Sequence, residues 1–84
     1  MGRLSNTTTE VAFGRELGQA VQRERLDRKL TGEDLARDSR VSVDQIRSIE
    51  QGKVASPGLY KIARIAVALG VSIDSLTPVI GDEA

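Results

Sequence analysis

The sequence predicts an all-α protein built as one small, compact domain of five helices. Its 84 residues match a single domain near the lower size limit for a self-sufficient core. Phe13 and Tyr60 are its two aromatic residues, so the core has to be small and aliphatic, which suits packed helices. Apolar residues also recur at helical spacing directly after Ser and Thr residues that can cap a helix start.

The composition excludes several functional classes. The chain has no cysteine, which rules out disulfides and thiolate metal sites, and no histidine, the commonest metal ligand and general base. We therefore expect no enzyme activity, no cofactor and no metal. No apolar run approaches the length of a membrane span, and the first residues lack the apolar core of a signal peptide. We expect no membrane partner and a cytoplasmic location.

The first helix is predicted to follow a polar, flexible N-terminal arm over residues 1–8. Thr7 and Glu10 form a capping signal, so the helix should start near Thr8 and run to about Asp27. Gly14 and Gly18 lie beside its apolar stripe and would allow another helix to approach closely. The stripe itself consists of Phe13, Leu17, Ala20, Val21 and Leu26.

Two further helices are predicted over residues 32–39 and 43–51, with a short break between them. Thr31 can cap the first in a capping box with Asp34, and Ser42 can cap the second with Gln45. Gly52 then supplies the residue type that helix C-termini favour. Two short capped helices joined by a few residues match the helix-turn-helix unit.

The fourth and fifth helices complete the prediction. Ser56 should cap the fourth, with Pro57 at its first position and Gly70 at its end. Ser72 should cap a short fifth helix, which Pro78 ends, leaving residues 77–84 as a C-terminal tail. The predicted inward stripe of the fourth helix is Leu59, Ile62, Ile65, Ala66 and Leu69.

An ordered series of residues over about 17–76 resembles a known family. The chain is similar to the DNA-binding domain of Cro, lambda-repressor and Xre-type regulators. This resemblance implies a lambda-repressor-like fold over residues 9–76, with the second and third helices as its helix-turn-helix. The residues that carry it are Leu30, Thr31, Leu35, Ala36, Val41, Ser42, Ile46, Ile49, Glu50, Gly52, Pro57, Leu69, Gly70 and Val71.

The resemblance implies double-stranded DNA as the partner and the helix at about 43–51 as the recognition helix in the major groove. Ile46 and Ile49 should face inward, which leaves an outward face for base edges. The expected base contacts are Val43, Asp44, Arg47 and Ser48. The expected phosphate contacts are Gly32, Arg37, Arg40, Lys53 and Lys61. Gly32 stands where the family often has a glutamine, so only backbone N–H groups remain for phosphate there.

Two structural sites also follow from the resemblance. Arg25 matches the family's arginine that pairs with the glutamate at Glu50, and a carboxylate next to the inward-facing Ile49 needs such a partner. Related proteins form two-fold dimers through the C-terminal region. Val71, Ile73 and Val79 are therefore the candidate homodimer contacts.

The charge balance leaves two functions open. Twelve basic and twelve acidic residues give a net charge of zero, although residues 23–64 contain ten basic and seven acidic residues, a local charge of +3. The first hypothesis is a sequence-specific, nucleoid-associated transcriptional repressor that binds a palindromic operator as a homodimer. The alternative is a protein-interaction module or antitoxin that kept the fold, binds a regulatory protein partner and binds DNA only weakly. Net neutrality, Gly32 and Asp44 favour this alternative.

Overall fold

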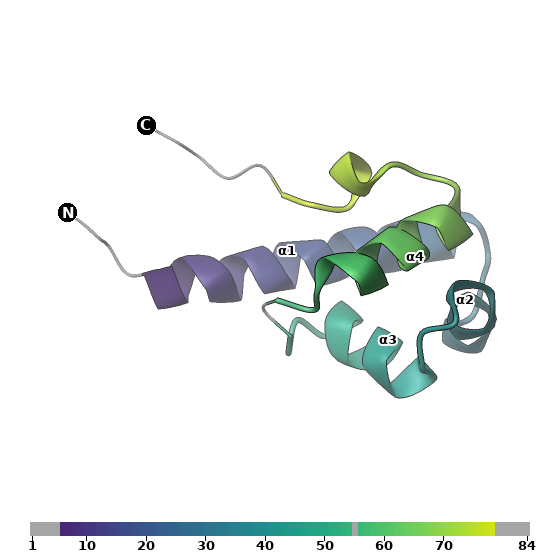
Figure 1. Ribbon diagram of the computed structural model, residues 1–84, viewed down its shortest axis with the longest axis horizontal. Coiled ribbons are helices and arrows are strands. Elements are labelled where there is room, and N and C mark those ends of the chain that lie inside the picture. The colour runs from purple at the N-terminus through teal and green to yellow at the C-terminus, as the bar shows by residue number, and fades with distance from the viewer. Residues whose placement is uncertain (1–5, 55, 79–84) are drawn as a thin grey trace.

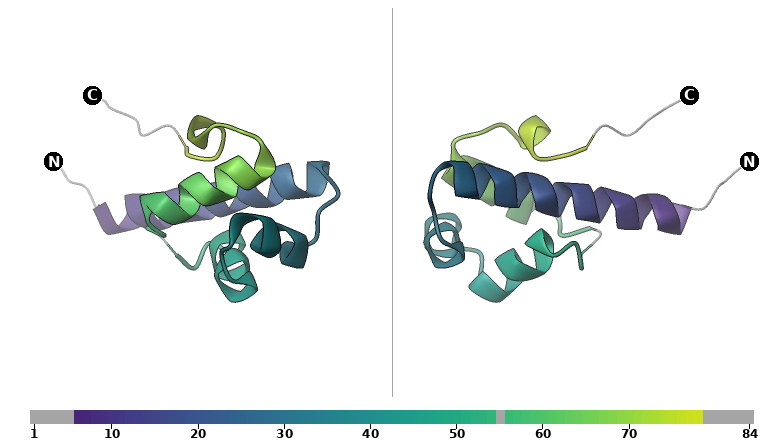
Figure 2. Two further views of the ribbon diagram at one scale, coloured as in Figure 1. Left: turned by 45° about the vertical axis from the view of Figure 1, so that its right-hand side comes forward. Right: turned by 180° about the vertical axis from the view of Figure 1, so that it is seen from behind.

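The computed structural model describes residues 6–54 and 56–78, and these fold into four α-helices and one turn of 3-10 helix. The long helix α1 (Asn6–Asp27) lies beside α4 (Leu59–Leu69), as both Figure 1 and Figure 2 show. Helices α2 (Gly32–Ser39) and α3 (Val43–Glu50) lie together on one side of this pair. The 3-10 helix η1 (Ile73–Ser75) lies on the opposite side.

The core lies where the four α-helices meet and is aliphatic, as the composition predicted. Helices α1, α3 and α4 each contribute one buried stripe, because their apolar residues recur every three or four positions, whereas α2 buries Leu35 and Ser39. Among the described residues, no helix is both long enough and apolar enough to cross a membrane. The core residues are Leu17, Ala20, Val21, Leu35, Val41, Ile46, Ile49, Ile62, Ile65, Ala66, Leu69 and Leu76.

The all-α class is confirmed, but the prediction of five helices is wrong for the described residues. The segment expected to form a fifth helix makes only the 3-10 turn η1. Only five residues separate Ser72 from Pro78. The ring of Pro78 also disfavours helical backbone at Thr77, so this segment is too short for a regular α-helix. At the other end, α1 includes residues 6–8, which were predicted to belong to the arm. Thr7 therefore lies inside α1 rather than at its cap.

The predicted N-caps at Thr31 and Ser42 are confirmed, but among the described residues the reciprocal capping box is complete only at the start of α2. The Thr31 hydroxyl accepts a hydrogen bond from the Asp34 N–H at 3.0 Å, and the Asp34 carboxylate accepts one from the Thr31 N–H at 3.0 Å. The Ser42 hydroxyl accepts a hydrogen bond from the Gln45 N–H at 3.2 Å. These bonds satisfy N–H groups that have no partner within the helix. The short break between α2 and α3 is therefore fixed by local sequence.

The predicted start of α4 is wrong. Gly58, not Ser56, is the residue at the N-cap, and the helix begins at Leu59. Gly58 has a φ of 96°, a conformation that cannot continue a helix, so Pro57 lies before the helix instead of at its first position. Leu59, expected to face inward, is 73% exposed because this first residue lies at the edge of the buried stripe.

Candidate nucleic-acid interface

Helix α3 buries one side and leaves the other open to solvent. Ile46 and Ile49 are 0% and 2% exposed, so they fix the inward side of the helix. The outer face of α3 is formed by the four predicted base-contact residues. Asp44 and Arg47 are exposed, whereas Val43 and Ser48 are half-buried at its edges. An eight-residue helix with one polar, uncovered side has the shape required to enter a major groove.

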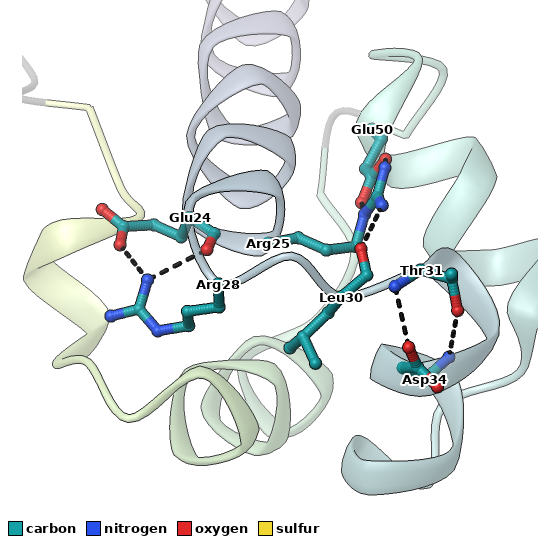
Figure 3. Close-up of polar contacts among 7 residues, drawn as sticks. All are labelled: Glu24, Arg25, Arg28, Leu30, Thr31, Asp34 and Glu50. Carbon is teal, nitrogen blue, oxygen red and sulfur yellow. Dashed lines mark hydrogen bonds and ion pairs between the residues drawn. The ribbon is translucent and has the colours of Figure 1, made fainter.

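A bidentate ion pair joins the C-terminal ends of α1 and α3. The Arg25 Nε and Nη2 donate hydrogen bonds to the two Glu50 carboxylate oxygens at 2.7 and 2.9 Å (Figure 3). The remaining Nη1 donates to the Leu30 carbonyl at 2.8 Å, just before α2 begins. The pair is largely buried, with 13% and 8% of the two side chains exposed. The Glu50 hydrogen bond raises the pKa of Arg25. Through its three hydrogen bonds, this guanidinium joins α1 to the end of α3 and to the loop before α2.

Two glycines allow the end of α3 to lie against the backbone of α1. Gly18 of α1 is in contact with the carbonyls of Ile49 and Glu50, where a β-carbon would overlap. Gly52, with a φ of 75°, lies against Arg15 of α1. Its N–H donates to the Ile49 carbonyl at 3.0 Å in a turn that ends α3. The close helix approach predicted for Gly18 is therefore present.

The first turns of α2 and α3 are neighbours. A β-carbon on Gly32 would lie 3.9 Å from the Val43 Cγ2, so the start of α2 lies beside the start of α3. Further along the same edge, the Arg47 Nη2 donates a hydrogen bond to the Glu33 carboxylate at 3.1 Å. The predicted phosphate contact at Gly32 and the predicted base contacts on α3 thus belong to one continuous surface.

The four remaining phosphate candidates differ in their surroundings. Lys61 lines a shallow hollow together with Asp44 and Ser48, so α4 contributes a basic side chain next to α3. Lys53 is exposed in the segment directly after α3. Arg37, by contrast, forms ion pairs at 3.4 Å with two carboxylates on α2 itself, and Arg40 is exposed at the α2 C-cap with a φ of 60°. No contact brings Arg37 or Arg40 to the outer face of α3 in the described part of the chain.

The three candidate dimer contacts differ in what the structure says about them. Val71 and Ile73 are half-buried and pack against the core, while Val79 lies outside the described residues. Within residues 10–54 and 56–78, the large apolar side chains with the greatest exposure are instead Leu59, Tyr60 and Val67 on α4. Leu59 and Val67 are 73% and 80% exposed. Leu59 borders a hollow with Phe13 and Ile73, whereas Val67 borders another with Asp38 and Arg64, so they lie on different sides of α4.

Sequence reasoning missed two side chains at this site. Glu33 was not singled out, although it binds Arg47 across the two helices. Arg64 was also missed, and its Nε donates a hydrogen bond of 2.6 Å to the Ser39 carbonyl at the end of α2. Both partners lie far from these residues in sequence, so no local pattern could have identified them.

The chain belongs to the helix-turn-helix domain family, whose model matches residues 16–78. Its fold is similar to the restriction-modification controller protein C.AhdI from Aeromonas hydrophila, with a TM-score of 0.72 and 25% identity over 75% of this chain and 94% of that one. It is also similar to the clp gene regulator ClgR from C. glutamicum, with a TM-score of 0.69 and 30% identity over 75% and 80% of the two chains. No curated protein sequence matches the chain.

These findings confirm the resemblance to Xre-type regulators. The family, the two regulator structures and the uncovered α3 together define a helix-turn-helix DNA-binding protein of the transcription-regulator class.

Proposed function

We propose that this protein is a sequence-specific transcriptional repressor that binds a palindromic operator as a homodimer. The proposal rests on one observation: α3 is fixed to the core at its C-terminal end, while its outer face is uncovered. The Arg25–Glu50 pair and the contact with Gly18 hold this helix rigidly at its C-terminal end, and its outer face stays uncovered. A rigid helix with a polar open side is suited to base readout, because its side chains need little reordering on binding.

The outer face of α3 supplies the proposed base contacts. Arg47 would donate to guanine, and the exposed Asp44 would accept from a cytosine amino group. Ser48 can contact either kind of base, and the half-buried Val43 offers a methyl group to thymine. Each good bidentate contact discriminates against the wrong base by about 1–3 kcal/mol. One such helix cannot provide high specificity alone.

The proposed phosphate contacts surround this face. The backbone N–H groups at Gly32 begin α2, where the helix dipole favours an anion. Lys61 lies on the α4 side of α3 and Lys53 follows its C-terminus. Arg37 and Arg40 remain candidates on the far end of α2. Arg37 would have to exchange its present carboxylate partners for a phosphate.

Dimerisation would double the base contacts. The two recognition helices of a two-fold dimer would read half-sites about 34 Å apart, one turn of the duplex. In Figure 1, α3 lies along the lower edge while α4 lies in front of α1, so a second copy against α4 would leave α3 free. The exposed Leu59 lines a hollow with Ile73, so we infer that the start of α4 adds to the candidate contacts Val71, Ile73 and Val79 from the prediction.

The competing function is a protein-interaction module or antitoxin with weak DNA binding. Net neutrality and the carboxylates of Glu33 and Asp44 around Arg47 favour it, because they reduce the attraction to phosphate. The two functions differ in one observable, which is the enrichment of a particular DNA sequence.

The deciding experiment is selection of bound duplexes from a random-sequence pool with the full chain. The recovered sites are then titrated against salt concentration, and the number of chains per duplex is measured. We expect a palindrome that binds two chains. Arg47→Ala should lose preference at one base pair, whereas Arg23→Ala is the matched control, because Arg23 lies beside Ser75 on the η1 side of α1. A pool without enrichment, bound weakly at low salt, would favour the interaction module.

A further inference from the structure

The guanidinium of Arg47 is held between two carboxylates. Its Nη2 donates a hydrogen bond to Glu33 of α2 at 3.1 Å, and its Nη1 lies 3.9 Å from the Asp44 carboxylate one turn earlier on α3. The three side chains are 57%, 68% and 91% exposed, respectively. This group therefore lies in solvent on the very surface that the proposed function turns toward DNA.

Stability does not explain this arrangement. An exposed ion pair contributes about 0–1 kcal/mol to folding, and the caps and the buried Arg25–Glu50 pair already fix α2 and α3. What the Glu33 contact does is restrict a side chain that otherwise has many rotamers. Since Arg47 is the one basic residue within α3, the contact favours one direction for the only guanidinium of this helix.

The charge of the group is also informative. One guanidinium and two carboxylates sum to −1, so this group attracts phosphate less than a lone guanidinium would, and the nearby Lys61 supplies the positive charge beside Asp44. A guanidinium has five N–H donors in a planar fork, and the Glu33 hydrogen bond uses one of them. The others remain available for the O6 and N7 of guanine.

We propose that Glu33 is a positioning residue for DNA readout. It holds the Arg47 guanidinium over the outer face of α3 for a base contact, and its charge weakens binding to DNA of any other sequence. This inference rests on the proposed function. It adds a specificity determinant that makes no base contact itself and that belongs to α2, not to the recognition helix.

The test compares the parent with Glu33→Gln, which keeps the side-chain shape and removes the charge. Affinities are measured for the selected operator, for each of its single-base variants and for random DNA over a range of salt concentrations. We expect Glu33→Gln to bind random DNA several-fold more tightly, with a salt slope steeper by about one. We also expect a loss of preference of about two- to fivefold at the same base pair that Arg47→Ala affects, which is what an exposed ion pair can contribute.

Two comparisons make the result specific. In an Arg47→Ala background, Glu33→Gln should no longer change any base preference, because the side chain it positions is gone. Glu24→Gln is the matched control, since it removes a carboxylate from the exposed ion pair with Arg28 on α1. It should leave both the preference profile and the salt slope unchanged.

The outcomes separate the two proposals. If the parent enriches an operator and Glu33→Gln keeps the full preference profile, Glu33 acts only as a distant charge and this inference is wrong while the proposed function stands. If the parent enriches no sequence, the proposed function fails and the inference fails with it.

Discussion

Gly18 of α1 lies directly against the carbonyl oxygen of Ile49 in α3, with the Glu50 oxygen 3.0 Å from the position of an added β-carbon. The backbones of the longest helix and the recognition helix are thus in contact with no side chain between them. Interiors packed this tightly cannot accept an extra methyl group without moving one element. The orientation of α3 on the core therefore depends on this glycine.

Replacing Gly18 with alanine should lower the free energy of unfolding by about 1–3 kcal/mol, because the new methyl group pushes α3 away from α1. Urea unfolding followed by circular dichroism measures the change. The matched control is Gly32→Ala, where a β-carbon meets only Val43 Cγ2 at 3.9 Å and helix propensity improves. A Gly18→Ala variant as stable as Gly32→Ala would contradict the close packing.

Removing the charge of Glu50 should lower the free energy of unfolding more than removing the charge of Glu24. Glu50→Gln leaves the Arg25 guanidinium, 13% exposed, without its carboxylate, and we expect a loss of about 3 kcal/mol in unfolding free energy. Glu24→Gln breaks the exposed pair with Arg28 and should cost about 0.5 kcal/mol or less. Chemical denaturation of both variants tests this difference. Equal losses would mean that the buried pair contributes no more than an ordinary surface contact.

The capping box at Thr31 should make stability depend on acid pH. Hydrogen bonds from the Thr31 backbone and side chain lower the pKa of Asp34 in the folded protein. A lowered folded-state pKa stabilises the fold above the unfolded value of about 3.9, and this contribution disappears as the pH falls through the folded pKa. The stability difference between the parent and Asp34→Asn should therefore shrink below about pH 4. Denaturation at a series of pH values measures it, and a constant difference would contradict the assignment.

Helix ends that depend only on residues close in sequence could be predicted from the sequence alone. The caps at Thr31 and Ser42 and the turn at Gly52 each need only residues within four positions, so their patterns fixed the bounds of α2 and α3 closely. The prediction failed at Gly58, because a proline suggested a helix start while the glycine after it adopted a left-handed backbone. There the two local preferences conflict, and the turn preference of Pro-Gly prevails.

In the candidate site, too, some features could be predicted from the sequence and others could not. The outward direction of Asp44 and Arg47 follows from the helical period, because buried isoleucines fix the opposite side. The partner of Arg47 could not be predicted, since Glu33 reaches it across fourteen positions and only the angle between two helices brings them together. Sequence patterns define the face of a helix, whereas the contacts between helices depend on packing.

Replacing Arg40 with glycine should raise the stability of the fold and, if Arg40 contacts a phosphate, weaken DNA binding. It caps α2 with a φ of 60°, a left-handed conformation that costs an L-residue about 1 kcal/mol relative to glycine. Arg40→Gly should therefore raise the unfolding free energy by about 1 kcal/mol. If Arg40 contacts a phosphate, the same variant also binds all DNA more weakly and has a shallower salt slope. Higher stability with unchanged DNA binding would remove Arg40 from the interface.

Lys53 provides the sharpest test of a phosphate contact. Its own N–H donates to the Ser48 carbonyl at 3.0 Å, so the backbone of Lys53 is fixed relative to α3 while its side chain is exposed. We expect a cation at this point to meet the duplex backbone when α3 enters the major groove. Lys53→Ala should weaken binding to the operator and to random DNA by the same factor, and should lower the salt slope by about one.

The measurement is a titration of both DNAs at several salt concentrations. Arg23→Ala serves as the control because it removes an equal charge from the η1 side of α1. Its affinity and salt slope should match those of the parent. Loss of preference at a single base pair would instead make Lys53 a base contact, and an unchanged salt slope would place the duplex away from the end of α3. Either result would require a different docking of this helix, because the Ser48 hydrogen bond leaves the backbone of Lys53 little freedom to move.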